Sequence, residues 1–260
     1  MQDTNGKPAP DPARPRARGL HYHQFLSRLH RFAIFDWYLE IGCRSGTTFA
    51  ETRSKTIAVD PFFRVQQNVI GNKRVLHVFQ MTSDEFFAGG FLKTNAIRPG
   101  FAFLDGMHLV EYALRDFMNV EANASEASIV AIHDCCPWTI EMTTRDIGNL
   151  PKGAWTGDVW KLVPILQKYR PDLTLTMLDS RPTGLLLVSG LDPASRALAG
   201  SHDGIVAEFA DLEMAEYGLD RFYDLFQFAG ADEMAKSGFD LFSGVPRDRD
   251  GPLTTRQVTP

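Results

Sequence analysis

Polar side chains follow five short apolar runs of this sequence, close to the points where the runs end. They are Glu40-Ile41-Gly42, Asp60, Ser83-Asp84, Asp105-Gly106-Met107-His108 and His133-Asp134. Carboxylates and imidazoles bind cations, ribose hydroxyls or protons, whereas glycines let a backbone approach a ligand closely. If the runs are parallel strands, their carboxyl ends meet at one edge of a sheet, where open α/β folds bind ligands. The sequence therefore predicts one polar site at that edge.

The apolar runs themselves predict the sheet. Residues 37–42, 56–60, 74–79, 100–105 and 128–134 are continuously apolar rather than alternating, as expected of parallel strands covered on both faces. Two more runs, 173–178 and 183–189, are separated by only four residues, which permits an antiparallel hairpin and excludes a parallel crossover. We therefore expect an α/β fold: a Rossmann-like, doubly wound sheet of seven strands, mostly parallel, with a C-terminal antiparallel hairpin.

Helical spacing fills the gaps between these runs. After the fourth run, apolar residues recur three and four positions apart, at Leu109, Tyr112, Ala113, Phe117 and Val120. A second such pattern occupies residues 204–226, with Ile205, Phe209, Leu212, Ala215 and Leu219. This second segment is either a C-terminal helix of the domain or a contact in a homodimer.

Composition restricts the kinds of partner. Of the 260 residues 44% are hydrophobic and 23% charged, and the net charge of −5 disfavours binding to nucleic acid or to an anionic membrane. We find no apolar run long enough to span a membrane and no signal peptide, and three cysteines do not suggest a disulfide scaffold. We expect a cytoplasmic chain with one domain over 20–243 and disordered tails over 1–19 and 244–260.

A glycine turn and an acid point to a nucleoside ligand. In EIGCRSG, Gly42 and Gly46 stand where the first strand turns into a helix expected to begin at Thr47. The G-x-x-x-G spacing is not the G-x-G-x-x-G of dinucleotide sites, which disfavours a nicotinamide dehydrogenase. Asp60 ends the second strand, where an acid can accept both ribose hydroxyls. The alternatives are an ordinary strand–helix turn and a turn-forming acid before Pro61.

Glu40 is unusual because it lies inside an apolar strand, where an unpaired carboxylate is costly. A cationic partner would compensate it. That partner is either the ammonium group of a bound amino acid moiety or a protein Arg or Lys.

Taken together, YLEIGCRSG, VDP, the loop with Ser83, FLDGMH and AIHDCCP resemble the consecutive motifs of class I S-adenosylmethionine-dependent methyltransferases. Within that class they are most similar to small-molecule O-methyltransferases with DGxH and HD motifs, over about residues 37–138. The resemblance implies that S-adenosylmethionine is the cofactor and that a small-molecule hydroxyl is the acceptor. It implies that residues at four places contact the cofactor. Asp60 would bind the ribose, Ser83 would lie near the adenine, and the remaining contacts would come from Glu40, Gly42, Arg44, Ser45, Gly46 and Asp105.

Transfer to a hydroxyl requires that the hydroxyl lose its proton. His108, just past the fourth strand, is the first candidate for the base, because an imidazole titrates near neutral pH. His133 is the second candidate, although its position within a buried strand favours a structural role. Either histidine can instead be a hydrogen-bonded core residue.

Asp105 and Asp134 end adjacent strands and are expected to lie close together. They can share a divalent cation such as Mg²⁺, which would bind and acidify the acceptor hydroxyl. Metal-dependent members of the class use acids at these two places and commonly add an amide oxygen, where this chain has Cys135. Without a metal, Asp105 contacts the cofactor and Asp134 caps the following turn.

The region 139–162 carries no motif to which a role can be assigned. Its Trp155 and Trp160 either belong to a lid over the acceptor or pack a helix onto the core, and Asp158 and Lys161 lie beside them. Two other functions stay open on this scaffold. One is a hydroxylase or other oxidoreductase with iron held by Asp105, His108 and His133, and the other is a non-catalytic domain that binds a nucleoside cofactor.

Overall fold

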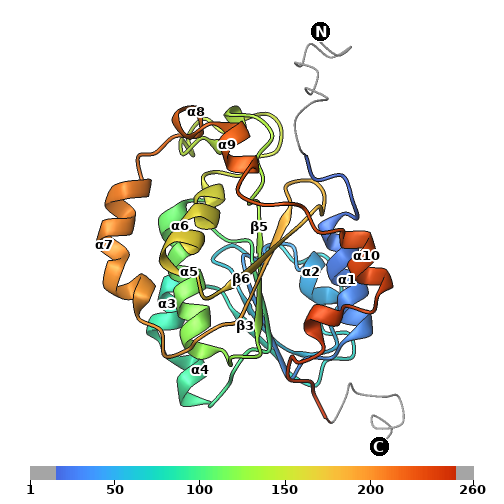
Figure 1. The fold of residues 1–260 in the computed structure, drawn as a ribbon. Coiled ribbons are helices and arrows are strands. Elements are labelled where there is room, and N and C mark those ends of the chain that lie inside the picture. Colours follow the sequence, from blue (N-terminus) through green and yellow to red (C-terminus); the bar gives the residue numbers. More distant parts are fainter. Residues whose placement is uncertain (1–15, 250–260) are drawn as a thin grey trace, which may run out of the picture.

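A seven-stranded sheet runs through the middle of the protein (Figure 1), in a computed structural model that describes residues 16–249. Its strands are β1 (Trp37–Ile41), β2 (Lys55–Val59), β3 (Leu76–Phe79), β4 (Phe101–Leu104), β5 (Ile129–His133), β6 (Thr174–Leu178) and β7 (Leu185–Ser189). Their spatial order is β3-β2-β1-β4-β5-β7-β6. β7 is antiparallel to β5 and to β6, and the other neighbours are parallel. The predicted sheet, with its C-terminal antiparallel hairpin, is confirmed.

The chain changes direction across the sheet between β1 and β4. From β1 it proceeds outward through β2 to β3, and then returns to add β4 on the other side of β1. Such a reversal opens a crevice beyond the carboxyl ends of the two central strands. The residues that follow Ile41 and Leu104 therefore meet at the same place.

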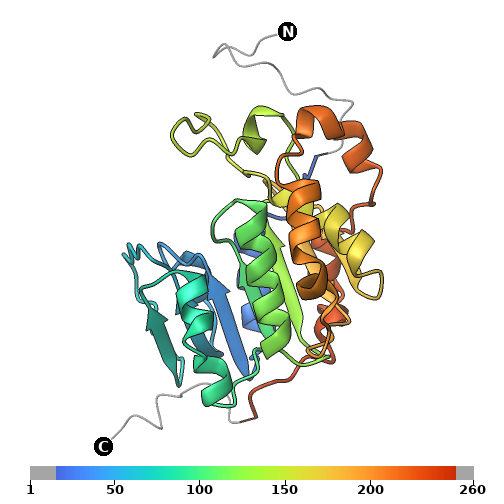
Figure 2. The same cartoon turned by 90° about the vertical axis from the view of Figure 1, so that its left-hand side faces the viewer.

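Helices cover both faces of the sheet (Figures 1 and 2). One face carries α3 (Ser83–Ala88), α4 (Phe91–Thr94), α5 (Val110–Asn123), α6 (Leu162–Tyr169) and α7 (Ala197–Phe209), and the other carries α1 (Tyr22–Phe32), α2 (Thr47–Ala50) and α10 (Ala231–Lys236). Strand pleating divides the core into two layers, the first under α3 to α7 and the second under α1, α2 and α10. In β4, Ala102 and Leu104 face the first layer, and Phe101 and Phe103 face the second.

Short elements complete the described chain: the helices α8 (Met214–Tyr217) and α9 (Leu219–Tyr223), and the 3₁₀ turns η1 (Glu141–Thr143), η2 (Val159–Lys161) and η3 (Asp240–Phe242). Of the helices within residues 16–249, none combines the length and the apolarity that crossing a membrane requires.

The two helical patterns of the sequence have different outcomes. α5 forms as predicted, with Ala113, Phe117 and Val120 buried against the sheet, although Tyr112 is partly exposed at the cavity described below. Residues 204–226 do not form one helix. They contribute the end of α7 and the separate α8 and α9, whose buried side chains belong to the first core layer.

The segments expected as tails are packed where the structure describes them. Ala17 is buried, and the Gly19 amide donates to the Asp179 carbonyl at 2.8 Å. At the other end Val245 is buried, and the Pro246 carbonyl accepts from the Asp36 amide at 3.0 Å. The domain therefore includes residues 16–19 and 244–249, and the remainder of both tail predictions lies outside the described residues.

Candidate active site

A cavity of about 1050 Å³ lies beyond the carboxyl ends of β1, β2, β4 and β5. Its wall includes the turn after β1 and Asp60 at one end, and Asp105, His108, His133 and Asp134 at the other. The volume matches that of a small-molecule or cofactor site. The strand-end side chains named from the sequence thus share one cavity, with the exceptions given below.

The turn after β1 needs glycine at position 42. Gly42 has a φ of +88°, and a Cβ atom there would lie 2.0 Å from the backbone oxygen of Asp105. The β1 and β4 ends can therefore approach each other only without a side chain at this position. Gly46 also has a positive φ and precedes α2, but it does not line the cavity, whereas Arg44 and Ser45 do.

Asp60 joins the two loops at this end of the cavity. Its Oδ2 accepts from the Arg44 amide at 2.8 Å, and its Oδ1 accepts from the Phe62 amide at 2.6 Å. An ionised carboxylate can accept about four hydrogen bonds, so two sites stay free on a side chain that reaches the cavity. The arrangement suits a pair of ligand hydroxyls.

Glu40 differs from the expectation. It is fully buried, does not line the cavity, and accepts hydrogen bonds from the Tyr38 hydroxyl at 2.6 Å and from the Thr48 hydroxyl. The partners in the structure are thus hydroxyls rather than a protein Arg or Lys, and the other expected partner, the ammonium group of a bound amino acid moiety, stays a prediction. Burial raises the pKa of Glu40 to about 8, which the two hydroxyls only partly oppose.

Ser83 lines the cavity at the start of α3, which is capped by the reciprocal Thr82–Glu85 pair. Behind it lies Asp116 of α5, which is hydrogen-bonded to the Ser83 side chain and almost fully buried. Burial raises the pKa of Asp116 to about 7. A carboxyl whose pKa lies near neutrality is therefore the hydrogen-bond partner of Ser83.

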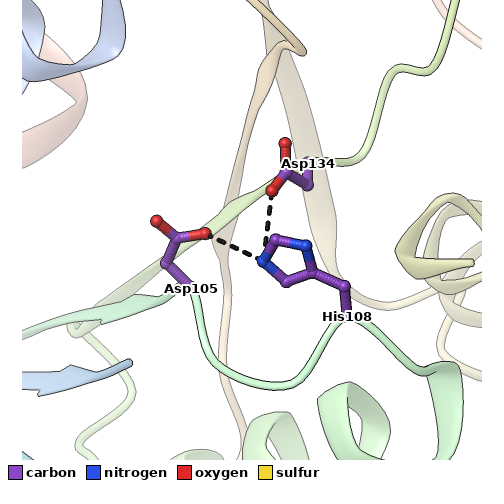
Figure 3. A group of neighbouring side chains, drawn as sticks. All are labelled: Asp105, His108 and Asp134. Carbon is purple, nitrogen blue, oxygen red and sulfur yellow. Dashed lines mark ion pairs between the residues drawn. The ribbon is translucent and has the colours of Figure 1, made fainter. Parts of the chain in front are cut away.

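Asp105, His108 and Asp134 converge at the other end of the cavity (Figure 3). His108 Nε2 lies 3.5 Å from Asp105 Oδ1 and 3.2 Å from Asp134 Oδ2. The backbone of Asp134 has a φ of +58°, an uncommon conformation that aspartate tolerates better than most residues and that recurs at functional sites. We refer to these three side chains as the Asp105–His108–Asp134 group.

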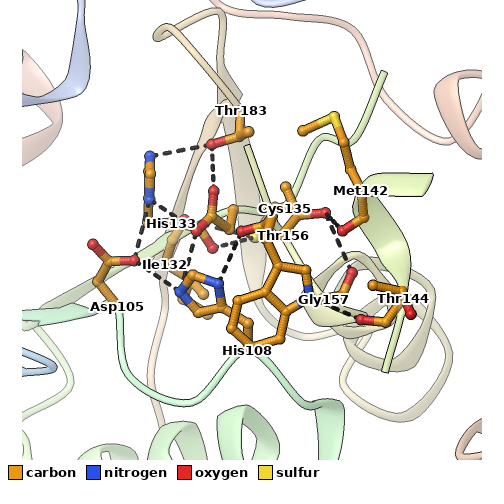
Figure 4. A network of polar contacts seen from close by, with 12 residues as sticks. Asp105, His108, Ile132, His133, Cys135, Met142, Thr144, Thr156, Gly157 and Thr183 are labelled. Carbon is orange, nitrogen blue, oxygen red and sulfur yellow. Dashed lines mark hydrogen bonds and ion pairs between the residues drawn. The ribbon is translucent and has the colours of Figure 1, made fainter. Parts of the chain in front are cut away.

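His133 supports the two carboxylates from the side (Figure 4). Its Nδ1 lies 3.2 Å from Asp105 Oδ1 and 3.4 Å from Asp134 Oδ2, and its Nε2 lies 3.2 Å from the Thr183 hydroxyl. That hydroxyl donates to Asp134 Oδ1 at 2.7 Å, so its oxygen accepts from Nε2. Both nitrogens of His133 therefore face acceptors.

The two carboxylates raise the pKa of both histidines. Burial opposes the charged imidazole of His133, but Asp134 and Asp105 outweigh it and raise the pKa to about 10. Burial also acts against His108, and the same two carboxylates raise its pKa. For Asp105 burial is outweighed by His133 and His108, which hold its pKa below the ordinary value. His133 therefore acts as a fixed cation rather than as a proton acceptor.

The region 139–162 fixes His108 from outside the sheet (Figure 4). The Trp155 carbonyl lies 3.1 Å from His108 Nδ1, and the Trp155 ring lies 4.9 Å from the imidazole. Because a carbonyl only accepts, Nδ1 carries a proton there. The Asp158 amide donates to the His108 carbonyl, and a Cβ at Gly157 would lie 1.7 Å from that oxygen.

The two tryptophans of this region have different surroundings. Trp155 lines the cavity, whereas Trp160 is fully buried against Tyr217 and Phe222. Packing onto the core is therefore confirmed for Trp160, and a place in a lid over the acceptor stays a prediction for Trp155.

Asp158 is at the centre of the ion pairs in the same region. It pairs with Arg145 and Lys161, and its Oδ1 accepts from the Val110 amide at 2.7 Å, where α5 begins. These contacts attach the region to the helix that follows His108.

Tyr22, His23 and Thr183 are among the residues of the site that the sequence analysis did not identify. Tyr22 and His23, at the start of α1, line the cavity, and the Tyr22 ring lies 3.8 Å from the His133 ring. Thr183 reaches the carboxylates from the loop between β6 and β7. The aromatic triplet His21-Tyr22-His23 was a visible signal, whereas no local pattern marks Thr183.

Comparison with known proteins gives matches among solved structures. No protein-family model matches the sequence. No curated protein matches it either. The MycE methyltransferase of the mycinamycin biosynthetic pathway, solved with Mg, SAH and mycinamycin VI, is 13% identical over 68% of this chain and 50% of that chain, with a TM-score of 0.44.

Two further matches are O-methyltransferases. TomG from Streptomyces achromogenes, solved with SAM, is 14% identical over 66% of this chain and 80% of that chain, with a TM-score of 0.41. The Bacillus cereus enzyme, solved with SAH, is 12% identical over 71% and 84%, with a TM-score of 0.43. The chain spans about half the length of the MycE chain. Identities this low concern the fold at most.

Proposed function

We propose that this protein transfers the methyl group of S-adenosylmethionine to a hydroxyl of a small molecule. The observation that carries the proposal is the single cavity, which has a glycine turn and Asp60 at one end and the Asp105–His108–Asp134 group at the other. A nucleoside ligand at the first end would point its other end towards the acids and imidazoles.

The residues present fit such a cofactor. The close approach of backbone at Gly42, the two free acceptor sites of Asp60 and the hydroxyl of Ser83 lie along one wall of the cavity. We assign Asp60 to the ribose hydroxyls, Ser83 to the adenine side, and Arg44 and Ser45 to the methionine side. Glu40 and Gly46 lie behind this wall and shape the turn without lining the cavity.

The cofactor supplies a methyl group on a positively charged sulfur, ready for in-line displacement. The protein must then orient the acceptor oxygen and receive its proton. The oxygen would lie beside His108 Nε2, where Asp105 and Asp134 raise the pKa of the imidazole and stabilise its protonated form. The Tyr22 ring contacts His133 and the Trp155 ring contacts His108 at this end of the cavity.

A divalent cation bound by Asp105 and Asp134 is the alternative means of deprotonation. Two carboxylate oxygens directed at one point fit a cation, which would lower the pKa of a hydroxyl bound to it. The iron site proposed from the sequence is less favoured. His133 Nδ1 faces the two carboxylates as a donor, and the converging group within residues 16–249 contains His108 rather than His133.

Calorimetric titration with S-adenosylhomocysteine tests the proposal, with NAD as the control ligand. We expect binding in the micromolar range, and a loss of at least about tenfold in affinity for Asp60→Asn, because the neutral amide accepts fewer hydrogen bonds from the ribose. Asp36→Asn, at a partly exposed acid paired with Lys55 away from the cavity, is the matched control and should bind normally. Binding of NAD but not of S-adenosylhomocysteine would overturn the proposal.

A further inference from the structure

The end of the cavity that holds the Asp105–His108–Asp134 group offers a metal ion both oxygen and nitrogen ligands. Two carboxylate oxygens and one imidazole nitrogen, from Asp105, Asp134 and His108, lie within 4.8 Å of one another. Cys135, beside Asp134, does not join them, because its sulfur is directed at the Ile132 and His133 carbonyls at 3.6 Å. The set is therefore two oxygens and one nitrogen.

The spacing of the donor atoms suits a bound ion. Ligands about 2.1 Å from a metal lie roughly 3.0 Å apart at octahedral angles and roughly 3.4 Å apart at tetrahedral angles. His108 Nε2 lies 3.2 Å from Asp134 Oδ2 and 3.5 Å from Asp105 Oδ1. Both distances from the imidazole nitrogen to a carboxylate oxygen are therefore close to those found between the ligands of one ion.

Neighbouring groups hold each of the three donors in a binding orientation (Figure 4). The Trp155 carbonyl accepts from His108 Nδ1–H, which leaves the Nε2 lone pair directed at the carboxylates. His133 donates to Asp105, and the Thr183 hydroxyl donates to Asp134 Oδ1, the oxygen that faces away from His108. Metal-binding histidines and carboxylates are generally fixed by outer partners of these kinds.

We propose that the Asp105–His108–Asp134 group binds a first-row transition-metal dication such as Zn²⁺, Fe²⁺ or Co²⁺ in preference to Mg²⁺, with His108 as the nitrogen ligand. Imidazole suits these ions, whereas Mg²⁺ prefers oxygen ligands and releases its waters reluctantly. Three protein ligands leave a coordination position on the cavity side for an acceptor oxygen, and a bound ion would then replace His108 as the group that promotes loss of its proton. Only this last role rests on the proposed methyl transfer.

Metal binding can be measured on the full chain, stripped with a chelator and without cofactor. Calorimetry with Co²⁺ and with Mg²⁺, together with the visible absorption of bound Co²⁺, gives the ratio of the two affinities. We expect Co²⁺ to bind at least about 100-fold more tightly than Mg²⁺. Equal affinities of the unsubstituted chain for Co²⁺ and Mg²⁺ would overturn the proposal, and no variant is needed for that result.

Two substitutions at one position isolate the imidazole. His108→Ala is expected to weaken Co²⁺ binding by at least about tenfold, and His108→Asn, which offers an amide oxygen, to lower the ratio of Co²⁺ to Mg²⁺ affinity by at least about tenfold. His23→Ala is the matched control, because His23 lines the same cavity outside the group. Unchanged Co²⁺ binding in both folded His108 variants would show that His108 is not a ligand.

The experiments distinguish failure of the metal-site proposal from failure of the proposed methyl transfer. A chain that binds S-adenosylhomocysteine but selects no transition metal keeps the methyltransferase proposal and loses this one. A chain that selects Co²⁺ through His108 but does not bind S-adenosylhomocysteine keeps the metal site and loses the methyl transfer.

Discussion

At the scale of single residues, burial decides which charged groups take part in chemistry and which support it. Glu40 and His133 both lie in central strands, but Glu40 faces hydroxyls and favours its neutral form, whereas His133 faces two carboxylates and favours its charged form. Strand position in the sequence indicated that both are buried. It could not indicate their partners, because Tyr38, Thr48 and Thr183 meet them only through the fold.

The pKa of Glu40 predicts a pH-dependent stability. A buried carboxyl whose pKa rises from 4.5 to about 8 stays protonated in the folded state, while the unfolded state ionises above pH 4.5. The contribution of Glu40 to the free energy of unfolding therefore falls as pH rises from 5 to 8, by up to about 1.4 kcal/mol for each pH unit. Glu40→Gln should flatten this dependence and be the more stable variant at pH 8.

Chemical denaturation at pH 5 and pH 8 measures the effect. Glu126→Gln, at an exposed acid of the loop before β5, is the matched control and should keep the dependence of the unsubstituted chain. An identical slope in Glu40→Gln would mean that Glu40 is ionised in the folded protein.

At the scale of elements, the seven strands followed from the sequence within about two residues at each end. Buried strands of a doubly wound sheet are continuously apolar, so their composition alone separates them from their surroundings. Residues 139–162 had no such signal, because they form two short 3₁₀ turns and loops rather than one periodic element. Their role arises from contacts with His108 that no local pattern encodes.

Among the glycines of residues 139–162, Gly157 has the least space for a side chain. Gly157→Ala would place a Cβ 1.7 Å from the His108 carbonyl oxygen, at a residue with a φ of +51°. We expect the free energy of unfolding to fall by about 1–3 kcal/mol. Since His108 must shift, the affinity for Co²⁺ should also fall, while binding of S-adenosylhomocysteine at the far end of the cavity stays unchanged.

Gly153→Ala is the control in the same loop, because nothing lies within 4 Å of its added Cβ. We expect Gly157→Ala to differ from the unsubstituted chain in denaturation and in Co²⁺ calorimetry, and Gly153→Ala to match it in both. Equal behaviour would show that the loop can move without disturbing His108.

At the scale of the whole molecule, the domain extends further along the chain than its composition indicated. Residues 16–19 and 244–249 are rich in Pro, Gly and Arg, which is typical of tails. Yet a few residues in each segment pack against the rest of the domain. Ala17 and Val245 are buried, and Arg247 forms a β-bridge with Phe35. Isolated apolar residues among polar ones give too weak a pattern to predict such docking.

Two truncations measure what the C-terminal contact contributes. A chain ending at residue 243 lacks Val245 and the backbone hydrogen bonds of Pro246 and Asp248, whereas a chain ending at residue 249 retains them. We expect the shorter chain to unfold with a free energy at least about 1.5 kcal/mol lower, from the buried Val245 alone. Equal thermal or chemical denaturation of the two would show that residues 244–249 add nothing to the fold.

The position of β7 between β5 and β6 has a consequence for synthesis on the ribosome. β5 finds its outer neighbour only after residue 189 has been made, and Thr183, which bonds to Asp134, arrives with the same hairpin. Because a chain emerges from its N-terminus, the strands that carry Asp105 and Asp134 can pair before the loop that orients them exists. A nascent chain stalled just before residue 183 therefore contains β1 to β6 but lacks both β7 and the Thr183 hydroxyl that donates to Asp134.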